Sequence, residues 1–517
     1  MKTLSAPQNR LPTLPALLIS SLMIVSCTLG PDFTRPAAPD VTGYAADQLS
    51  KETTQTLVLG KALPGQWWTL YHSKPLTALI AQALKNNPDL QSAQATLIQA
   101  QELAQAKKGS LLPSLDASAY AANQQISGAQ FGNPQGGSSI FSLYNTSVKV
   151  SYTLDVFGAI RRQIENLSAQ AEYQKFQLEG VFLTLAANIV TTALQEASLR
   201  AQITATEAVI GAQVQQLEVI KQQFELGGVA KAAVLAQQST LAQTRTNLPP
   251  LQAALAQARH RLNVLVGTFP SAPMAAQFNL DELTLPDQLP LSLPSKLVEQ
   301  RPDIRAHEAL LHAASAQIGV VAASVFPDFT ISANIGSIAT QAGGLFVPGS
   351  EIWSLTGNLL QPLFHGGDFT HKKYAAIAGY EQVAAQYRST VLKAFQDVAD
   401  TLSALEFDAN ALKTQDAALQ ASKESLELTQ AQFKMGAVSY LSLLSAERDY
   451  QQASIGRIKA QVARLADTAA LFQALGGGWW QRGNLSDALL ADKKNQQKPC
   501  SYFDCWINPL PTPLPKK

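Results

Sequence analysis

The feature that most constrains the fold of this 517-residue chain is an internal duplication. The same motifs recur at one constant offset in residue number through the second part of each copy. The matching positions are Gly158 and Gly367, Phe224 and Phe433, and Gly267 and Gly476. A constant offset over such a distance predicts helices of equal length, without insertions, in both copies.

The beginning of each copy matches at a slightly larger offset. Pro88 corresponds to Pro302 and Pro113 to Pro327, and these two pairs share the larger offset. The length difference must fall between Pro113 and Gly158, in a Gly/Ser-rich stretch that is typical of a loop, because loops tolerate insertions that packed helices do not. We therefore predict repeat 1 at 76–267 and repeat 2 at 290–476, joined by a Pro-rich linker at 268–289.

Each repeat is predicted to contain a very long helix. The stretch 159–226 has no proline and only two isolated glycines, so as one helix it would reach roughly 100 Å. The stretch 368–435 mirrors it. A turn at the following glycines then leads into a return helix. In repeat 1 the pair Pro249-Pro250 interrupts that return helix, and we expect a break there and none in repeat 2.

Segments of alternating polarity lie between these helices. In Ser147–Phe157, apolar residues such as Val148 and Val150 alternate with polar residues such as Lys149. Alternation over about 10 residues is the signature of outer-membrane barrel strands. We predict four strands, at about 114–123, 145–157, 327–338 and 351–364.

Four strands cannot close a barrel in a membrane. Small membrane barrels have at least eight strands, and an open sheet edge would leave backbone groups without partners in lipid. The strands must therefore be pooled from several copies of the chain. Two copies give eight strands and three give twelve, and a lumen wide enough for cargo favours three or more.

The N-terminus is predicted to direct export. A positive start precedes a short apolar run at 14–25, too short to span a bilayer. Residues 1–26 are the predicted signal peptide, and the run ends in a pattern that resembles the lipobox of bacterial lipoproteins. That resemblance implies acylation of Cys27 and an acylated segment at 27–75; the alternative is an ordinary signal peptide with an incidental cysteine.

The remaining composition excludes several functions. The net charge of +1 gives no indication of nucleic-acid binding. There is no HExxH, GxSxG or phosphate-binding loop, and the six histidines are scattered, so we predict no enzyme, no cofactor and no metal site. Cys500 and Cys505, in a tail at 477–517 expected to be partly disordered, could form a local disulfide or remain free thiols.

The motifs together resemble a known family. They are Cys27–Pro36 (CTLGPDFTRP), Gln66-Trp67-Trp68, Asn87-Pro88-Asp89, Leu154–Gly158 (LDVFG) with Arg161-Arg162, Leu248–Leu251 (LPPL), Arg301–Ile304 (RPDI) and Leu475–Trp479 (LGGGW). In order and spacing they resemble the outer-membrane factor lipoproteins of the TolC/OprM (NodT-like) class, over about 27–480.

This resemblance implies a mainly α fold with a membrane β-barrel portion. Three copies would form a homotrimer with a 12-stranded barrel, bound by outer-membrane lipid, on a periplasmic α-helical tunnel. It implies a passive channel in a Gram-negative outer membrane that exports drugs or other small molecules. Its partners would be a periplasmic adaptor protein and an inner-membrane pump, often of the RND type, and no nucleic acid.

Two alternatives change the function. The first is an outer-membrane duct for a protein or peptide (type I-like) secretion system, which the lipobox and the NodT-like motifs disfavour. The second is an envelope lipoprotein of coiled helices without a pore. It predicts continuous heptads and no alternating strands, which the segment 147–157 contradicts.

The resemblance also implies site residues. The turns would meet the adaptor, through Gly227, Gly228 and Val229 in repeat 1 and Gly436, Ala437 and Val438 in repeat 2. Just beyond the second turn, Leu441, Ser442 and Ser445 match the periplasmic gate. Related channels carry Asp at the position of Ser445, and some also at Ser442, so this sequence departs from an acidic gate. Leu441 would then carry the constriction alone, with Glu447 and Asp449 as substitutes for the charge.

Overall fold

The structure, a computed structural model, describes residues 28–41, 43–44, 55–132, 135–273 and 276–482. In chain order the elements are β1 (Thr56–Leu59), α2 (Lys74–Asn86), α3 (Pro88–Gly109), β2 (Ser114–Ser127), β3 (Ser138–Leu154), α4 (Ala159–Glu225), α5 (Lys231–Thr246), α6 (Leu248–Leu265), β4 (Gln288–Leu291), α7 (Pro294–Gln300), α8 (Pro302–Ala323), β5 (Asp328–Ala339), β6 (Glu351–Leu360), α9 (Asp368–Lys434) and α10 (Tyr440–Ala474).

The chain divides into two units. The first, called the strand unit here, comprises Met1–Arg35, Gln99–Glu172 and Glu308–Gln386. The second, the helix unit, comprises Pro36–Ile98, Tyr173–His307 and Tyr387–Lys517. Each unit therefore draws on both repeats.

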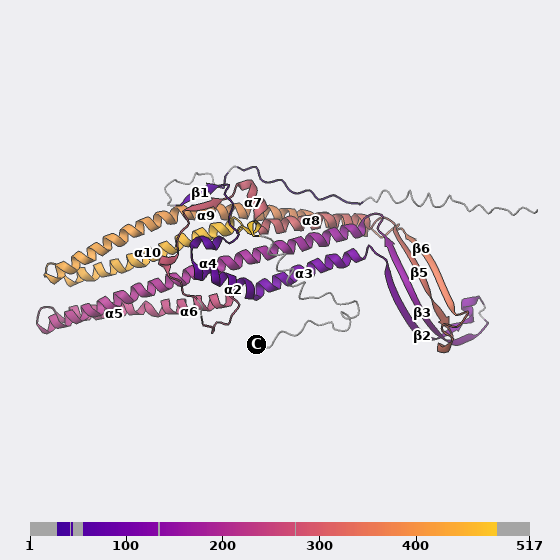
Figure 1. The fold of residues 1–517 in the computed structure, drawn as a ribbon, viewed down its shortest axis with the longest axis horizontal. Coiled ribbons are helices and arrows are strands. Elements are labelled where there is room, and N and C mark those ends of the chain that lie inside the picture. The colour runs from indigo at the N-terminus through magenta and orange to yellow at the C-terminus, as the bar shows by residue number, and fades with distance from the viewer. Residues whose placement is uncertain (1–27, 42, 45–54, 133–134, 274–275, 483–517) are drawn as a thin grey trace, which may run out of the picture. The chain divides into compact units, whose positions relative to one another are not determined.

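The strand unit contains one antiparallel sheet in the order β2-β3-β5-β6 (Figure 1). The four strands lie where the alternation predicts them, but the first hairpin is longer than expected. Pairing continues to Ser127 opposite Ser138, next to the connecting segment. The predicted Gly/Ser-rich loop lies between the strands as expected, since β2 ends at Ser127 and β3 begins at Ser138. The added pairs lie between the predicted strand ends and that loop.

The register of the sheet sorts side chains into rows that run across all four strands. One apolar row is Leu115, Val150, Ala333 and Leu355, and the next is Ala117, Val148, Ile335 and Trp353. Between them lies a polar row of Asp116, Lys149, Asn334 and Ser354. Residues paired across strands share a face, and successive residues alternate between faces. One face of the sheet therefore carries the apolar rows and the other the polar ones.

The sheet ends in two unpaired edges. Among the described residues, β2 pairs only with β3, and β6 pairs only with β5. Each outer strand therefore presents a row of backbone N–H and C=O groups without ladder partners.

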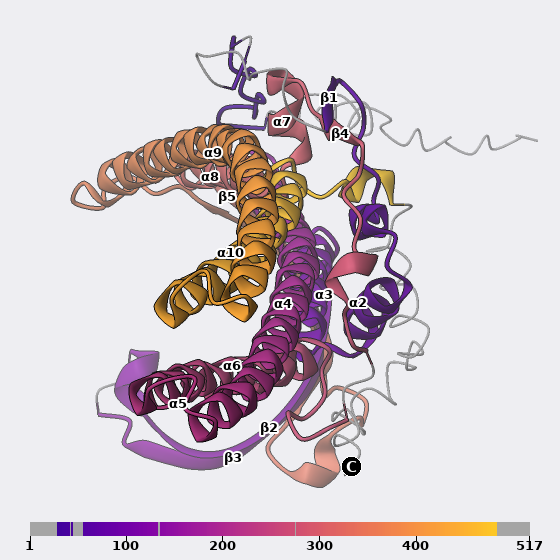
Figure 2. The ribbon, with the colours of Figure 1, turned by 90° about the vertical axis from the view of Figure 1, so that its left-hand side faces the viewer.

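The long helices confirm the prediction from the duplication. α4 and α9 each contain 67 residues, and their first residues, Ala159 and Asp368, are separated by the offset that the motifs share. α5 returns alongside α4, and α10 returns alongside α9 (Figure 2). The return path of repeat 1 breaks at Asn247, where two prolines open α6, whereas α10 is continuous. The predicted difference between the repeats is therefore confirmed.

The helix unit shows the duplication as a repeated contact. Asn87 donates a hydrogen bond to the carbonyl of Leu265 over 3.0 Å, and its counterpart Arg301 donates to the carbonyl of Ala474 over 3.1 Å. Directly beyond these carbonyls, Gly267 and Gly476 have positive φ.

Those two glycines also lie against backbone. A Cβ on Gly267 would come within 2.5 Å of the carbonyl oxygen of Asn86, and one on Gly476 within 2.6 Å of that of Gln300. Only glycine combines this backbone conformation with so close an approach. In each repeat, this glycine and the hydrogen bond beside it therefore attach the end of the return helix to the beginning of the same repeat.

Aromatic side chains fill the core of the helix unit. Trp67, Trp68 and Tyr71 are buried, and Trp67 packs against Phe472 with ring centroids 5.6 Å apart. The linker contributes β4, which pairs in parallel with β1, an element that the sequence did not predict. α4 contains the one stretch in the described chain that is apolar enough to cross a membrane, but 67% of it is buried.

A half-buried acid, Asp467, lies beside this core. Burial first, and then the nearby carboxylate of Asp408, raises the pKa of Asp467 from 3.8 to about 7, and Arg464 opposes the shift only partly. Arg464 is itself buried, and its Nη1 has no hydrogen-bond partner. The folded chain therefore holds the Asp467 proton more tightly than the unfolded chain.

The raised pKa of Asp467 predicts how stability depends on pH. Between about pH 4 and 7 the unfolded state releases this proton and the folded state retains it, so stability falls as pH rises. Asp467→Asn should remove part of that slope, measured by thermal unfolding of the purified protein followed by circular dichroism. Asp449→Asn, at an exposed site on the same helix, is the control. An unchanged slope in Asp467→Asn would contradict the assignment.

Candidate functional site

The two hairpin tips have the same backbone geometry. At the end of α4, Gly227 has φ +76°, and the N–H of Gly228 donates to the carbonyl of Gln223 over 2.7 Å. At the end of α9, Gly436 has φ +71°, and the N–H of Ala437 donates to the carbonyl of Gln432 over 2.9 Å. Both helices therefore end in a left-handed glycine that satisfies otherwise free carbonyls.

The valines at the tips are not the most exposed apolar residues. Val229 and Val438 are half-buried, whereas Leu226 is 88% exposed and Met435 is 75% exposed. Leu226 and Met435 are related by the same offset as the repeat motifs, so they are equivalent in the two repeats. Sequence reasoning missed this pair, although the repeat offset would have indicated it.

The predicted gate residues share one exposed surface of α10. Leu441 is 74% exposed, and Ser442 and Ser445 are exposed with it. Leu443 and Leu444 are buried on the opposite side of the helix. Ser439 caps the helix, and its Oγ accepts a hydrogen bond from the N–H of Ser442 over 3.3 Å. The cap fixes where α10 begins, and so which residues its first turn exposes.

The two acids one turn further along the helix lie on different sides. Asp449 is exposed, on the side of Leu441 and Ser445, because positions four apart share a helix face. Glu447 is only 9% exposed. Glu447 therefore cannot replace a missing gate carboxylate at this surface, whereas Asp449 lies on the side where such a charge would act.

A polar link joins the two hairpins near these residues. The hydroxyl of Tyr440, in the first turn of α10, donates to the side-chain oxygen of Gln237 on α5. Gln237 in turn donates to the backbone carbonyl of Gln213 on α4 over 3.1 Å. Burial raises the pKa of Tyr440 above its ordinary value, so the hydroxyl stays protonated as a donor. The first turn of α10, in repeat 2, is thus tied to repeat 1.

Cys27, the predicted acylation site, lies outside the described residues, as do Cys500 and Cys505. The segment directly after Cys27 is held by Arg162 of α4. The guanidinium donates to the carbonyls of Leu29 over 2.9 Å and Gly30 over 3.2 Å, and pairs with Asp32 over 2.8 Å. Arg162 therefore fixes residues 29–32 within the strand unit.

The described residues offer no group of side chains that could hold a metal ion. They contain no cluster of three His, Cys, Asp or Glu side chains. His312 stacks on Phe33 with ring centroids 4.5 Å apart, and its Nε2 lies 2.9 Å from a carboxylate oxygen of Glu165. This histidine has a packing role in the strand unit.

Residues 79–268 and 293–477 match the outer membrane efflux protein family, one stretch in each repeat. The chain belongs to this family. It is 27% identical over 465 residues to the cation efflux system protein CusC of Escherichia coli O6:H1, covering 89% of this chain and 98% of CusC. It is 30% identical over 421 residues to the pyoverdine export outer membrane protein OpmQ of Pseudomonas aeruginosa, covering 80% and 87%.

The fold is shared with solved outer-membrane channels. The structure superposes on the open state of the MtrE outer membrane channel of Neisseria gonorrhoeae with a TM-score of 0.76 and 26% identity, covering 88% of this chain and 99% of that one. The predicted fold class, the outer-membrane location and the efflux-channel function are confirmed. Members of this family are channel proteins.

The tip glycines give a stability prediction. Gly436→Ala should destabilise the hairpin by about 1–2 kcal/mol, because a Cβ is unfavourable in the left-handed conformation. Gly211→Ala, in the interior of α4 with open space around its Cβ position, should instead stabilise by roughly 0.5–1 kcal/mol. Thermal unfolding of both variants measures the difference. A Gly436→Ala variant as stable as Gly211→Ala would show that the tip geometry does not require glycine.

Proposed function

We propose that three copies of this chain form a passive outer-membrane duct that receives small molecules from an inner-membrane pump through a periplasmic adaptor. The single observation that carries the proposal is the four-stranded sheet with two unpaired edges and one apolar face. In lipid such edges must be paired, and three sheets joined edge to edge give twelve strands in a closed barrel. The duct itself catalyses no reaction.

The apolar rows of the sheet support this orientation. Leu115, Leu355 and Trp353 are exposed on the isolated chain, which is unfavourable in water and favourable against lipid tails. The polar row of Asp116 and Lys149 would then face the lumen. β3 and β5, with 17 and 12 residues, are long enough to cross the hydrocarbon layer.

The adaptor would bind at the hairpin tips. Gly227, Gly228 and Val229 in repeat 1, with Gly436, Ala437 and Val438 in repeat 2, form the turns themselves. The exposed Leu226 and Met435 add an apolar contact at equivalent places. A partner that recognises both repeats could therefore use one type of contact twice.

The periplasmic gate would be formed by Leu441, Ser442 and Ser445 from each copy. The exposed position of Leu441 suits an apolar constriction, and the two serines supply no charge. The acyl anchor would be Cys27, attached directly to the segment that Arg162 holds. Anchoring by two or more acyl chains is firm, whereas a single chain binds only marginally.

The cargo class distinguishes the two transport hypotheses. CusC is named for cation efflux and OpmQ for pyoverdine export, and both are small cargoes. We therefore favour small-molecule efflux over a protein or peptide secretion duct. A deletion strain should become sensitive to drugs or metals and still secrete proteins normally; loss of a secreted protein without such sensitivity would favour the secretion duct.

Conductance tests the duct itself. The purified protein should cross-link as a trimer and form stable conducting pores in planar bilayers. A protein that remains a monomer and does not conduct would overturn the proposal.

The apolar face gives a prediction for membrane assembly. Leu355→Arg places a charge on the proposed lipid face, at a cost of about 2–4 kcal/mol per copy near the bilayer centre. Trimer recovered from outer membranes should therefore fall sharply. Ser354→Arg, the neighbouring residue on the opposite face, is the matched control and should assemble. Equal losses in both variants would contradict the assignment of faces.

The serine-bearing mouth gives a prediction for ion block. Divalent cations added on the periplasmic side should block the wild-type pore only weakly, because serine rings do not attract cations. Ser445→Asp should create three carboxylates at the mouth and strong block by Mg²⁺, whereas Ser445→Asn should behave like the wild type. Single-channel recording measures the block. Strong block of the wild-type pore would show that other acids, such as Asp449, control the entrance.

A further inference from the structure

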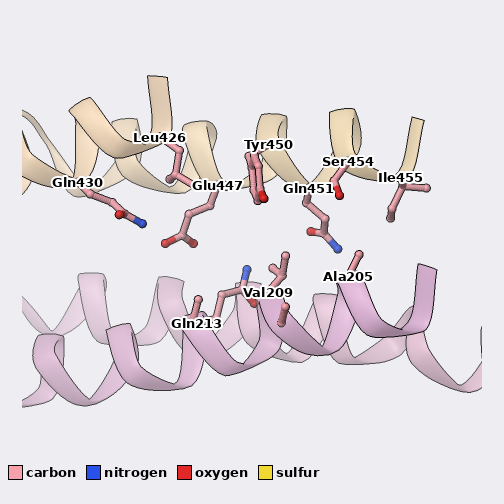
Figure 3. Close-up of a pocket in the computed structure, with 12 residues that line it drawn as sticks. Ala205, Val209, Gln213, Leu426, Gln430, Glu447, Tyr450, Gln451, Ser454 and Ile455 are labelled. Atoms are coloured by element: carbon pink, nitrogen blue, oxygen red, sulfur yellow. The ribbon is translucent and has the colours of Figure 1, made fainter. Parts of the chain in front are cut away.

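A cavity of about 180 Å³ lies between the two hairpins in the helix unit, separate from the exposed gate surface (Figure 3). α4 forms one wall, and α9 and α10 form the other. For comparison, a cavity of about 150 Å³ lined by aliphatic side chains is large enough to bind benzene. The space is therefore sufficient for a small organic molecule and too small for most drugs.

The cavity contains a carboxylate without a cation. Glu447 of α10 points into the space from one wall and Gln213 of α4 from the other (Figure 3). Glu447 is 9% exposed and Gln213 is 2% exposed. Glu447 Oε2 and Gln213 Oε1 are buried acceptors that have no hydrogen-bond partner among the described residues. The groups that act on the Glu447 carboxyl within this part of the chain include no cation.

This arrangement is energetically unfavourable when the cavity is empty. Burial raises the pKa of Glu447, and a hydrogen bond from Gln213 opposes the shift only partly. A buried carboxylate without a cationic partner and an amide oxygen without a donor both cost free energy. A ligand that brings a positive charge and N–H donors would satisfy both oxygens at once.

The lining also contains apolar side chains, beside the uncharged polar side chains of Gln430, Gln451 and Ser454. Val209 on α4, Leu426 on α9 and Ile455 on α10 face the same space, and the ring of Tyr450 lies beside them. An aliphatic or aromatic group would pack against these side chains, and an aromatic ring also attracts a nearby cation. The lining therefore combines one carboxylate with apolar side chains and uncharged polar groups, and contains no cationic side chain.

We propose that this cavity binds a small organic ammonium ion, with its N–H groups on Glu447 and Gln213 and its apolar part against Val209, Leu426 and Ile455. A bare metal ion fits less well, because hard divalent cations are held mainly by carboxylates and water, and Glu447 is the one carboxylate in a lining whose other polar groups are amides and hydroxyls. Since the ligand contacts helices of both repeats, binding would stabilise their packing near the Tyr440–Gln237 link.

The test uses the purified, assembled protein and benzylammonium chloride as the probe. Isothermal titration calorimetry should show one site per chain, and bound probe should raise the unfolding temperature. Benzyl alcohol, which has the same shape without the charge, should bind at least about tenfold more weakly, because hydrogen bonds to charged groups are the stronger ones. Mg²⁺ alone should not compete with benzylammonium.

Two variants locate the site. Glu447→Gln keeps the shape of the side chain and should weaken benzylammonium by about tenfold or more, with little effect on benzyl alcohol. The control Glu207→Gln, at an exposed site on α4, should bind like the wild type. Val209→Phe fills the cavity, leaves the carboxylate in place, and should abolish binding of both compounds.

The outcomes are distinct. No binding to the wild type, equal binding to Glu447→Gln, or displacement by Mg²⁺ would each overturn the proposal. If Glu447→Gln does not assemble, Val209→Phe decides, since retained binding there would place the ligand elsewhere. None of these measurements depends on conductance or transport, so failure here would leave the proposed duct function unaffected.

Discussion

The unpaired edges of the four-stranded sheet are the constraint on which this protein depends. β2 and β6 each offer a row of backbone donors and acceptors that water can satisfy and lipid cannot. The same strands carry exposed apolar rows that water disfavours and lipid accepts. In water, a single copy leaves its apolar face exposed to solvent. In lipid, it leaves the backbone groups of its two edges unpaired. Only a closed assembly pairs every edge and also places the apolar face against lipid.

The duplication explains how one chain supplies two equivalent halves of the structure. The contact of Asn87 with Leu265 recurs as that of Arg301 with Ala474, and a glycine follows each contact. The two halves differ in the structure of their return helices. Two prolines divide the return helix of repeat 1, whereas α10 runs unbroken and carries both the proposed gate residues and the buried Glu447. The structural contacts and the tip turns are shared between the repeats, whereas the proposed gate and the cavity carboxylate belong to repeat 2.

Two acids with raised pKa values lie in the helix unit of a chain with only 15% charged residues, Glu447 buried and Asp467 half-buried. Asp467 beside the aromatic core and Glu447 in the cavity both have raised pKa values, in each case chiefly because burial disfavours the charged form. Asp467 faces Asp408 and Arg464, so its environment comes from the chain itself. Glu447 faces a cavity lined by apolar and uncharged polar side chains, with no cationic group among them, so a ligand is the simplest source of a positive charge.

The sequence alone determined the features that depend on local pattern and repeat spacing. The constant offset between the repeats predicted the equal lengths of α4 and α9, and alternating polarity, clear in two segments and weaker in the other two, predicted the four strands. The break at Asn247 followed from two prolines, which cannot continue a helix. The resemblance of the motifs added the family, which the comparisons then confirmed.

The tertiary structure alone decided which side chains are exposed and which are buried between helices. Local pattern does not distinguish the positions of Glu447 and Asp449, yet the packing of α10 buries the first and exposes the second. The tertiary structure also leaves Leu226 and Met435 more exposed than the two valines of the hairpin tips. Both outcomes depend on contacts between segments that are far apart in the sequence, because a helix has several faces and only its neighbours determine which of them meets water.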